Sequence, residues 1–242
     1  MHAIETKHLT KRYKDVVAVD DLNLTVEKGE IFALLGVNGA GKTTAIKMLS
    51  CLTVPTSGDA NVFGMSILTE AQHIKQAIAL SPQDTAIAPN LTVEENLKLI
   101  SGVHGACKRD AEERIAELSV LLGLDEILKR RAGKLSGGWQ RRLSIAMALI
   151  SNPMLLFLDE PTLGLDVIAR SELWDIIRNL RGKTTVILTT HYMEESEALS
   201  NRIGIMKGGK LLTTGTANEL MSQTGTTRFE DAFIAIVKDG KI

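Results

Sequence analysis

The stretch that decides the fold is Gly36-Val37-Asn38-Gly39-Ala40-Gly41-Lys42-Thr43. The apolar run at 31–35 precedes it, and a segment of helical character at 44–49 follows it. A strand, a glycine loop and a helix in this order are the context of a phosphate-binding P-loop. The glycines let the backbone turn sharply and aim N–H groups inward, and the helix start adds positive partial charge. Lys42 is expected to pair with the β and γ phosphates, and Thr43 to offer its hydroxyl to Mg²⁺.

Length and composition exclude several other classes of protein. The 242 residues suffice for one large domain, or for one domain with an inserted lobe. A formal net charge of −1 gives no general attraction to nucleic acid, which is not an expected partner. Cys51 and Cys107 lie far apart without metal-binding spacing, so free thiols in a reducing compartment are expected. No apolar run approaches the ~20 residues that cross a bilayer, so we expect a soluble, cytosolic chain unless a partner holds it at a membrane.

The segments that precede the P-loop predict an antiparallel β layer. Apolar and polar residues alternate over 3–9 and again over 22–26. Tyr13 lies between these segments, beside Lys11, Arg12 and Lys14. Its ring could stack on a nucleotide base with help from the cations, or it could pack at a strand edge. The residues alone leave both roles open.

Gln83 follows the compact apolar run 77–80, where a strand is expected to end. Its carbonyl oxygen could contact a metal-bound water, although a turn residue after Pro82 explains it equally well. Apolar residues then recur at helical spacing, which predicts a helical lobe over about 84–150. The basic run 129–131 is expected to close one helix of this lobe.

Ser136, Gly137 and Gly138 stand at the start of a further predicted helix. A serine and two glycines at a helix start can form a second anion-binding nest. They can equally be an N-cap with a glycine turn. Taken alone, these residues favour the N-cap.

The unbroken apolar run 154–158 predicts a buried parallel strand that ends in Asp159 and Glu160. Ligands of open α/β sheets lie at the carboxyl ends of the strands, so both carboxylates are expected near the P-loop. Asp159 suits Mg²⁺ binding, and Glu160 suits polarising a water in line with the γ phosphate. The run 185–190 predicts another strand, which ends in His191, a side chain able to donate to a phosphate oxygen.

In this order, the motifs resemble those of the nucleotide-binding subunit of ATP-binding cassette (ABC) transporters, over essentially the whole chain, 1–242. Gly36–Thr43 resembles the Walker A loop, Leu135–Trp139 the signature loop, and Leu155–Glu160 the Walker B strand. Tyr13 matches the position of the A-loop and Gln83 that of the Q-loop. Leu165-Asp166 resembles the D-loop, and His191 the switch histidine. Nucleotide-binding residues under this resemblance are Tyr13, Gly36, Asn38, Gly39, Ala40, Gly41, Lys42, Thr43, Thr44, Ser136, Gly137 and Gly138.

The resemblance implies an α/β fold of the P-loop NTPase (RecA-like) type, with a parallel-sheet core, an antiparallel β layer and the inserted α-helical lobe. It implies ATP and Mg²⁺ as cofactors, with Thr43, Gln83 and Asp159 directed to the metal. Glu160 is then the catalytic residue, assisted by His191 and Gln83.

The resemblance also implies partners. Two cassettes, as a homodimer or a heterodimer, would meet head to tail, each ATP lying between the Walker A loop of one subunit and the signature loop of the other. A separate transmembrane permease would hold the chain at the cytoplasmic face of the membrane. Trp139 stands where the common signature has Gln, and Gln140 follows it. We expect nucleotide binding to survive because Ser136 and both glycines remain.

The segments 191–198 and 229–233 resemble the subgroup that energises drug, antibiotic or lipid-type exporters. The leading hypothesis is therefore an ATPase subunit that powers export through a separate permease. The alternative is a soluble ABC-type protein of translation or repair, but those resemble paired cassettes or carry long coiled-coil insertions. A P-loop kinase or GTPase would leave the Ser136 nest unexplained.

Overall fold

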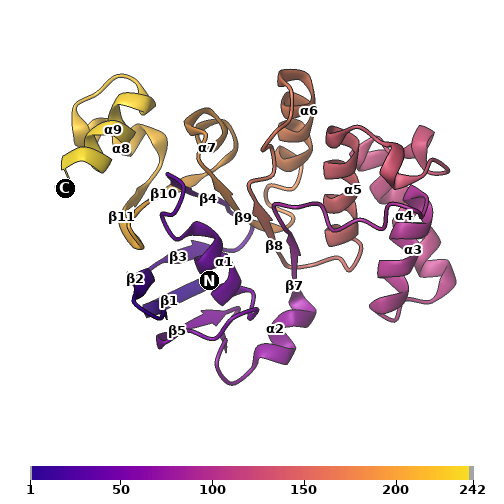
Figure 1. Cartoon of the computed structure of the whole chain (residues 1–242), viewed down its shortest axis with the longest axis horizontal. Helices are drawn as coiled ribbons and strands as arrows, with labels where there is room; N and C mark the ends of the chain where they lie inside the picture. Colours follow the sequence, from indigo (N-terminus) through magenta and orange to yellow (C-terminus); the bar gives the residue numbers. More distant parts are fainter. Residues whose placement is uncertain (1, 240–242) are drawn as a thin grey trace.

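A six-stranded sheet forms the centre of the computed structural model, which describes residues 2–239 (Figure 1). Its strand order is β11-β10-β4-β9-β8-β7, and only β11 runs antiparallel to its neighbour. The strands are β4 Ile31–Gly36, β7 Ile78–Ser81, β8 Leu155–Asp159, β9 Thr185–Thr190, β10 Arg202–Lys207 and β11 Lys210–Gly215. Every residue of β4, β8 and β9 is buried, as expected for parallel strands covered on both faces.

A second, antiparallel sheet lies beside the first. Its strands are β1 His2–Tyr13, β2 Val16–Leu22, β3 Thr25–Glu27, β5 Ser57–Val62 and β6 Met65–Ser66. This confirms the predicted β layer. β1 extends further than the alternation suggests, because Tyr13 pairs with Val16 and only residues 14–15 form the turn to β2.

Helices follow the strands and cover the central sheet. They are α1 Lys42–Leu49, α2 Ala71–Ala77, α6 Val167–Arg178, α7 Met193–Leu199, α8 Ala217–Thr224 and α9 Phe229–Asp239. α1 begins at Lys42, two residues earlier than predicted, so Lys42 and Thr43 lie in its first turn. The P-loop therefore leads directly into a helix N-terminus, as its context requires.

Three helices and two 3-10 turns make up the predicted lobe, at the right of Figure 1. They are α3 Val93–Val103, α4 Lys108–Leu122, η1 Asp125–Ile127, η2 Ala132–Lys134 and α5 Gly137–Leu149. α3 begins with a capping box, in which Thr92 and Glu95 each accept the other's backbone N–H. Leu97 and Ile115 belong to the same hydrophobic core as Leu156 of β8. One continuous hydrophobic core joins the lobe to the sheet, so the core does not mark where the lobe begins and ends. The limits near 84 and 150 therefore stay a prediction.

The basic run 129–131 does not close an α-helix of the lobe, contrary to the prediction. It follows η1, and the chain there lies against the start of α3. The N–H groups of Val93 and Glu94 donate to the carbonyl oxygens of Arg130 and Leu128, at 3.0 and 2.9 Å. The segment therefore satisfies N–H groups that a helix start leaves without an internal partner.

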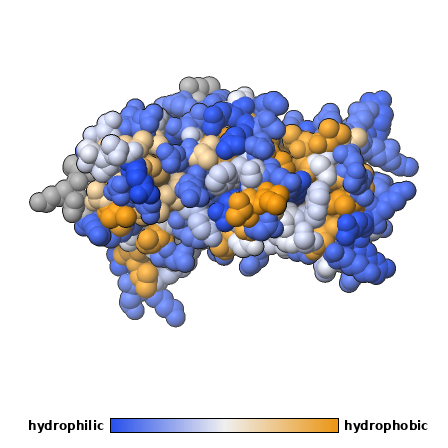
Figure 2. Space-filling model, turned by 90° about the horizontal axis from the view of Figure 1, so that it is seen from above, coloured by the Kyte–Doolittle hydropathy of each residue, from blue (hydrophilic) through white to orange (hydrophobic). Residues whose placement is uncertain are grey.

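The surface carries apolar side chains in small, separate patches among polar ones, as the face in Figure 2 shows. Val167 and Ile168, at the start of α6, are among the most exposed apolar residues, at 76% and 72%. Over residues 2–239, no helix has the length and hydropathy needed to cross a bilayer.

Candidate functional site

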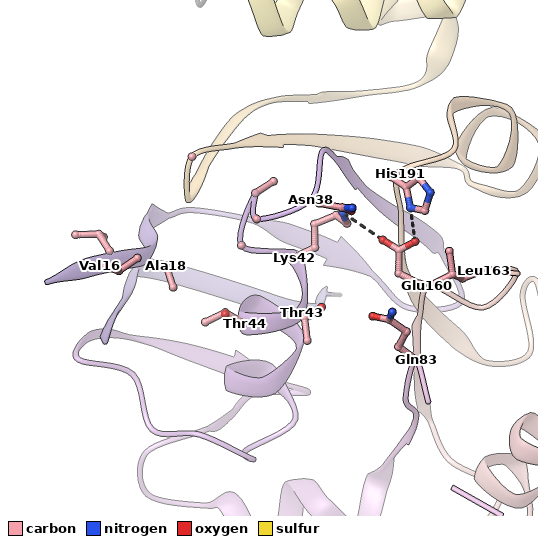
Figure 3. Close-up of a pocket in the computed structure, with 15 residues that line it drawn as sticks. Val16, Ala18, Asn38, Lys42, Thr43, Thr44, Gln83, Glu160, Leu163 and His191 are labelled. Carbon is pink, nitrogen blue, oxygen red and sulfur yellow. Dashed lines mark hydrogen bonds and ion pairs between the residues drawn. The ribbon is translucent and has the colours of Figure 1, made fainter. Parts of the chain in front are cut away.

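A cavity of about 690 Å³ opens at the carboxyl ends of β4, β8 and β9 (Figure 3). Most of the predicted site residues line it, and they come from segments far apart in the sequence. They are Asn38, Gly39, Ala40, Gly41, Lys42, Thr43, Thr44, Gln83, Glu160 and His191. The structure thus brings together the glycine loop and the polar side chains that the sequence placed at strand ends. Asp159 and Gly36 lie directly beneath, in the ends of β8 and β4.

Two glycines allow the P-loop to pass close to neighbouring backbone. A Cβ added at Gly41 would lie 2.4 Å from the carbonyl oxygen of Ala18, and its φ of +102° is one that L residues rarely adopt. A Cβ at Gly36 would lie 2.5 Å from the carbonyl oxygen of Met206. The loop is therefore held between β2 and the end of β10, and larger residues would displace it.

Lys42 is buried, and its ammonium group points along the P-loop into the site. Its Nζ donates to the carbonyl oxygen of Gly36 at 2.7 Å and lies 3.3 Å from Oε1 of Glu160 (Figure 3). A buried ammonium group requires such compensation. The side chain is thus oriented before any phosphate arrives.

Glu160 joins Lys42 to His191. Its Oε2 accepts a hydrogen bond from Nδ1 of His191 at 2.6 Å, while Oε1 faces Lys42. The backbone of Glu160 is left-handed, with φ of +50°, which is uncommon for a residue with a side chain. Its N–H donates to Oγ1 of Thr189 at 3.0 Å, and this bond holds the unusual conformation in place. The carboxylate is therefore fixed at the cavity wall, where a general base must lie.

Asp159 and Thr43 bring oxygen atoms together below the cavity. The hydroxyls of Thr43 and Thr189 both donate to Oδ1 of Asp159, at 3.1 and 2.5 Å. Hydroxyl, carboxylate and the nearby Gln83 amide are oxygen ligands of the kind that Mg²⁺ prefers. Within 2–239 no three His, Cys, Asp or Glu side chains gather into a metal-binding group.

Gln83 is held by the lobe. The guanidinium group of Arg141, on α5, donates to the carbonyl oxygens of Pro82, at 2.7 Å, and of Gln83. Burial lowers the pKa of Arg141, and the nearby carboxylates, Asp159 foremost and then Asp84, oppose this shift. This arginine, which the sequence did not single out, connects the helix that follows the Ser136 nest to the nucleotide cavity.

Tyr13 does not line the cavity. Its ring is 46% exposed, and Nζ of Lys11 lies 5.0 Å from the ring centroid. Its strand partner Val16 does line the cavity, so Tyr13 lies near the cavity entrance. Base stacking by Tyr13 remains a prediction.

Ser136, Gly137 and Gly138 start α5 and lie outside the cavity lining. Ser136 occupies the N-cap position of α5 with extended backbone, but its side chain makes no capping hydrogen bond. Gln140 instead secures the loop, because its Nε2 donates to the carbonyl oxygen of Leu135 at 3.1 Å. Trp139 packs at the border of the main hydrophobic core, and the Arg142 guanidinium lies 4.5 Å from its ring centroid.

Sequence reasoning missed two groups of site residues. Residues 16–18 of β2, Leu163 and Gly208 form part of the cavity wall. Thr189 contacts both Asp159 and the backbone of Glu160. A signal for Thr189 exists in the sequence, because it is a hydroxyl residue at the end of an otherwise apolar strand, two positions before His191.

Fold and site together define a P-loop protein of the ATPase class. The family model described as ABC transporter matches residues 19–163. The chain therefore belongs to the ABC transporter family. Daunorubicin/doxorubicin resistance ATP-binding protein DrrA of Streptomyces peucetius is 42% identical over 93% of this chain and 68% of its own length.

Three further likenesses agree with this assignment. "Probable multidrug ABC transporter ATP-binding protein YbhF" of Escherichia coli (strain K12) is 41% identical over 98% of this chain, which spans only 42% of that relative. A solved ATP-binding subunit of an ABC transporter superposes with a TM-score of 0.86 at 26% identity, covering 97% of this chain and 99% of its own. A dimeric ATP-binding cassette bound to ADP and Pi, in a post-hydrolysis state, gives 0.80 at 26% identity, over 88% and 98%.

We predict that Thr189→Val destabilises the folded chain by about 1–3 kcal/mol, because Asp159 and the Glu160 N–H each lose a buried partner. The free energy of unfolding, measured in urea without nucleotide, checks this. Thr184→Val, at a half-buried threonine just before β9, should change it by less than about 0.5 kcal/mol. Equal stability of Thr189→Val and the unaltered chain would show that these hydrogen bonds contribute nothing net.

Proposed function

We propose that this chain binds ATP with Mg²⁺, hydrolyses it, and powers export by a separate membrane permease through ATP-driven dimerisation. The observation that carries this proposal is the meeting of Lys42, Glu160 and His191 in one cavity, above the oxygens of Thr43 and Asp159. Each group has a task that phosphoryl transfer to water requires.

The binding step uses the P-loop. Its backbone N–H groups and the N-terminus of α1 attract phosphate, and Lys42 adds a full positive charge. Thr43, Asp159 and Gln83 would hold Mg²⁺, which neutralises charge on the phosphate oxygens when bound. These oxygens lie at the base of the cavity, beside Lys42.

The hydrolytic step assigns different roles to Glu160 and His191. Glu160, already ionically paired, would accept a proton from the attacking water as a general base. The hydrogen bond from Nδ1 of His191 orients the carboxylate, and in the imidazolium form Nε2 would also carry a proton to donate to a phosphate oxygen. General-base catalysis contributes about 10²–10⁴ in rate.

We predict that Glu160→Gln lowers kcat for ATP hydrolysis by about 10²-fold or more while ATP still binds, because the amide cannot accept the proton. Lys42→Ala should instead weaken ATP binding by about 10-fold or more, since a charge-assisted contact is lost. Lys47→Ala, on the exposed face of the same helix, is the matched control. A coupled phosphate-release assay and nucleotide titration measure both. Full hydrolysis by Glu160→Gln would refute the general-base role.

Dimerisation accounts for the second anion nest. Ser136 and Gly137 lie outside the cavity, with an uncapped hydroxyl and open space around the glycine. They would reach the γ phosphate bound by a second subunit. The exposed Val167 and Ile168, directly after the Leu165-Asp166 turn, offer apolar surface for the same contact. ATP would then hold two chains together, and loss of the γ phosphate would release them.

Complementation tests this sharing of sites. Lys42→Ala and Gly137→Asp should each be nearly inactive alone, and Gly137 has no atom within 4 Å of an added Cβ, so the fold should tolerate the change. In a mixed dimer, one pocket combines an intact P-loop with an intact nest. A mixed dimer has one intact pocket instead of two, so mixing should restore up to about one half of the wild-type ATPase activity per dimer. No recovery, with mixed dimers demonstrated by pull-down, would argue against shared pockets.

Export and the permease are inferred from the relatives, whose names refer to multidrug transport and to daunorubicin and doxorubicin resistance. The chain itself has no spanning helix within residues 2–239. We place it at the cytoplasmic face of the membrane, held there by the permease. Sedimentation with membranes only when a partner permease is co-expressed would support this, and binding to ribosomes or DNA would favour the translation or repair alternative.

A further inference from the structure

Glu195 is a buried carboxyl group for which the hydrolytic scheme has no use. It lies on α7, four residues after His191, and none of its surface is exposed. Glu194 and Glu197, on the same short helix, are exposed to solvent. Burial of a carboxyl group without a cation is unfavourable, so its position requires a specific set of partners.

Three segments of the site supply those partners. The indole Nε1 of Trp174, on α6, donates to Oε1 of Glu195 at 3.2 Å. The hydroxyls of Thr162 and Thr190 face the same carboxyl group. Thr162 comes two residues after Glu160, and Thr190 comes directly before His191. One carboxyl group therefore contacts the loop that follows the general base and the strand end that carries the switch histidine.

Thr190 also connects Glu195 to the backbone that follows His191. Oγ1 of Thr190 accepts the N–H of Tyr192 at 2.9 Å. Its own proton is then left to donate to Glu195, because a hydroxyl has one donor. Both residues that flank His191 are thus tied, through Thr190, to the buried carboxyl group.

The arrangement favours a neutral carboxyl group. Burial raises the pKa of Glu195 and the charge of Glu160 adds to this shift, while the neighbouring hydroxyls of Thr190 and Thr162 and the indole of Trp174 oppose it. Among the described residues, Oε2 of Glu195 and Oγ1 of Thr162 are both buried, and neither has a well-aligned hydrogen-bond partner. A protonated Oε2 would supply the donor that Thr162 can accept.

We propose that Glu195 is a positioning residue for ATP hydrolysis: it ties the Thr162 loop to the end of β9 and so keeps Glu160 and His191 at their 2.6 Å contact. The inference rests on the proposed function. Glu195 does not line the nucleotide cavity, so its loss acts on the geometry of the catalytic pair rather than on ATP binding. Small misplacements of reacting groups are enough to slow a reaction by up to about 10²-fold.

Two substitutions at Glu195 separate positioning from charge. Glu195→Gln keeps the shape, an acceptor for Trp174 and a donor for Thr162, so kcat should stay within about threefold of the wild type. Glu195→Ala removes all three contacts, and kcat should fall by about 10-fold or more while KM for ATP changes less than about twofold. Glu194→Gln and Glu194→Ala, the same changes at the exposed neighbour, should leave both constants unaltered.

Where Glu195→Ala does not yield folded protein, Thr190→Val cuts the same link through one hydroxyl and should show the same fall in kcat without a rise in KM. A second readout does not depend on hydrolysis. Trp174 is one of two tryptophans, so in a Trp139→Phe background the emission comes from Trp174 alone and responds to its contact with Glu195. The emission should change in Glu195→Ala and stay nearly the same in Glu195→Gln.

The outcomes separate failure of the proposed ATPase function from failure of the Glu195 inference. A wild-type chain with no ATPase activity beside its permease would overturn the proposed function, and this inference with it. An active wild type with unchanged kcat in both Glu195→Ala and Thr190→Val would overturn the inference alone. A loss in Glu195→Gln equal to that in Glu195→Ala would also overturn it, since the neutral isostere is expected to serve.

Discussion

The carboxylate of Glu160 lies between the ammonium group of Lys42 and the imidazole of His191, and the rest of the site is arranged around this contact. The side chains of Lys42 and Glu160 are buried, so each of these two charges depends on the other, and His191 adds a hydrogen bond to the carboxylate. Strand pairing brings them together. Leu35 of β4 pairs with Thr190 of β9, which places the end of the strand that leads to the P-loop beside the strand that leads to His191. The site is therefore a consequence of parallel register at one edge of the sheet.

Two further side chains, Thr189 and Arg141, connect this group to β9 and to α5. Thr189 accepts the N–H of Glu160 and donates to Asp159, so the two carboxylates at the end of β8 share one support. Arg141 ties the start of the Gln83 loop to α5, the helix that begins at Ser136. A contact between Ser136 and a nucleotide on another subunit would thus be mechanically connected to the first subunit's own cavity. One buried guanidinium group thus joins the lobe to the Gln83 loop.

Much of this site could be predicted because its signals are local. A few consecutive residues are enough to recognise the glycine loop between strand and helix. The same holds for the apolar runs that end in Asp159 and His191. What could not be predicted depends on distant contacts. The close approach of Gly41 to Ala18 makes β2 part of the cavity wall, and the carbonyl oxygen of Arg130 meets the start of α3. No local pattern encodes such pairs, since either member alone resembles an ordinary turn or basic run.

The contact between Glu160 and His191 can be observed directly by ¹⁵N NMR of the imidazole ring, with the His191 signals assigned from a His191→Ala variant. The structure predicts that Nδ1 of His191 carries a proton that is donated to the Glu160 carboxylate, and that its resonance shifts in Glu160→Ala, where the acceptor is gone. Identical His191 ring resonances in the wild type and in Glu160→Ala would contradict the account.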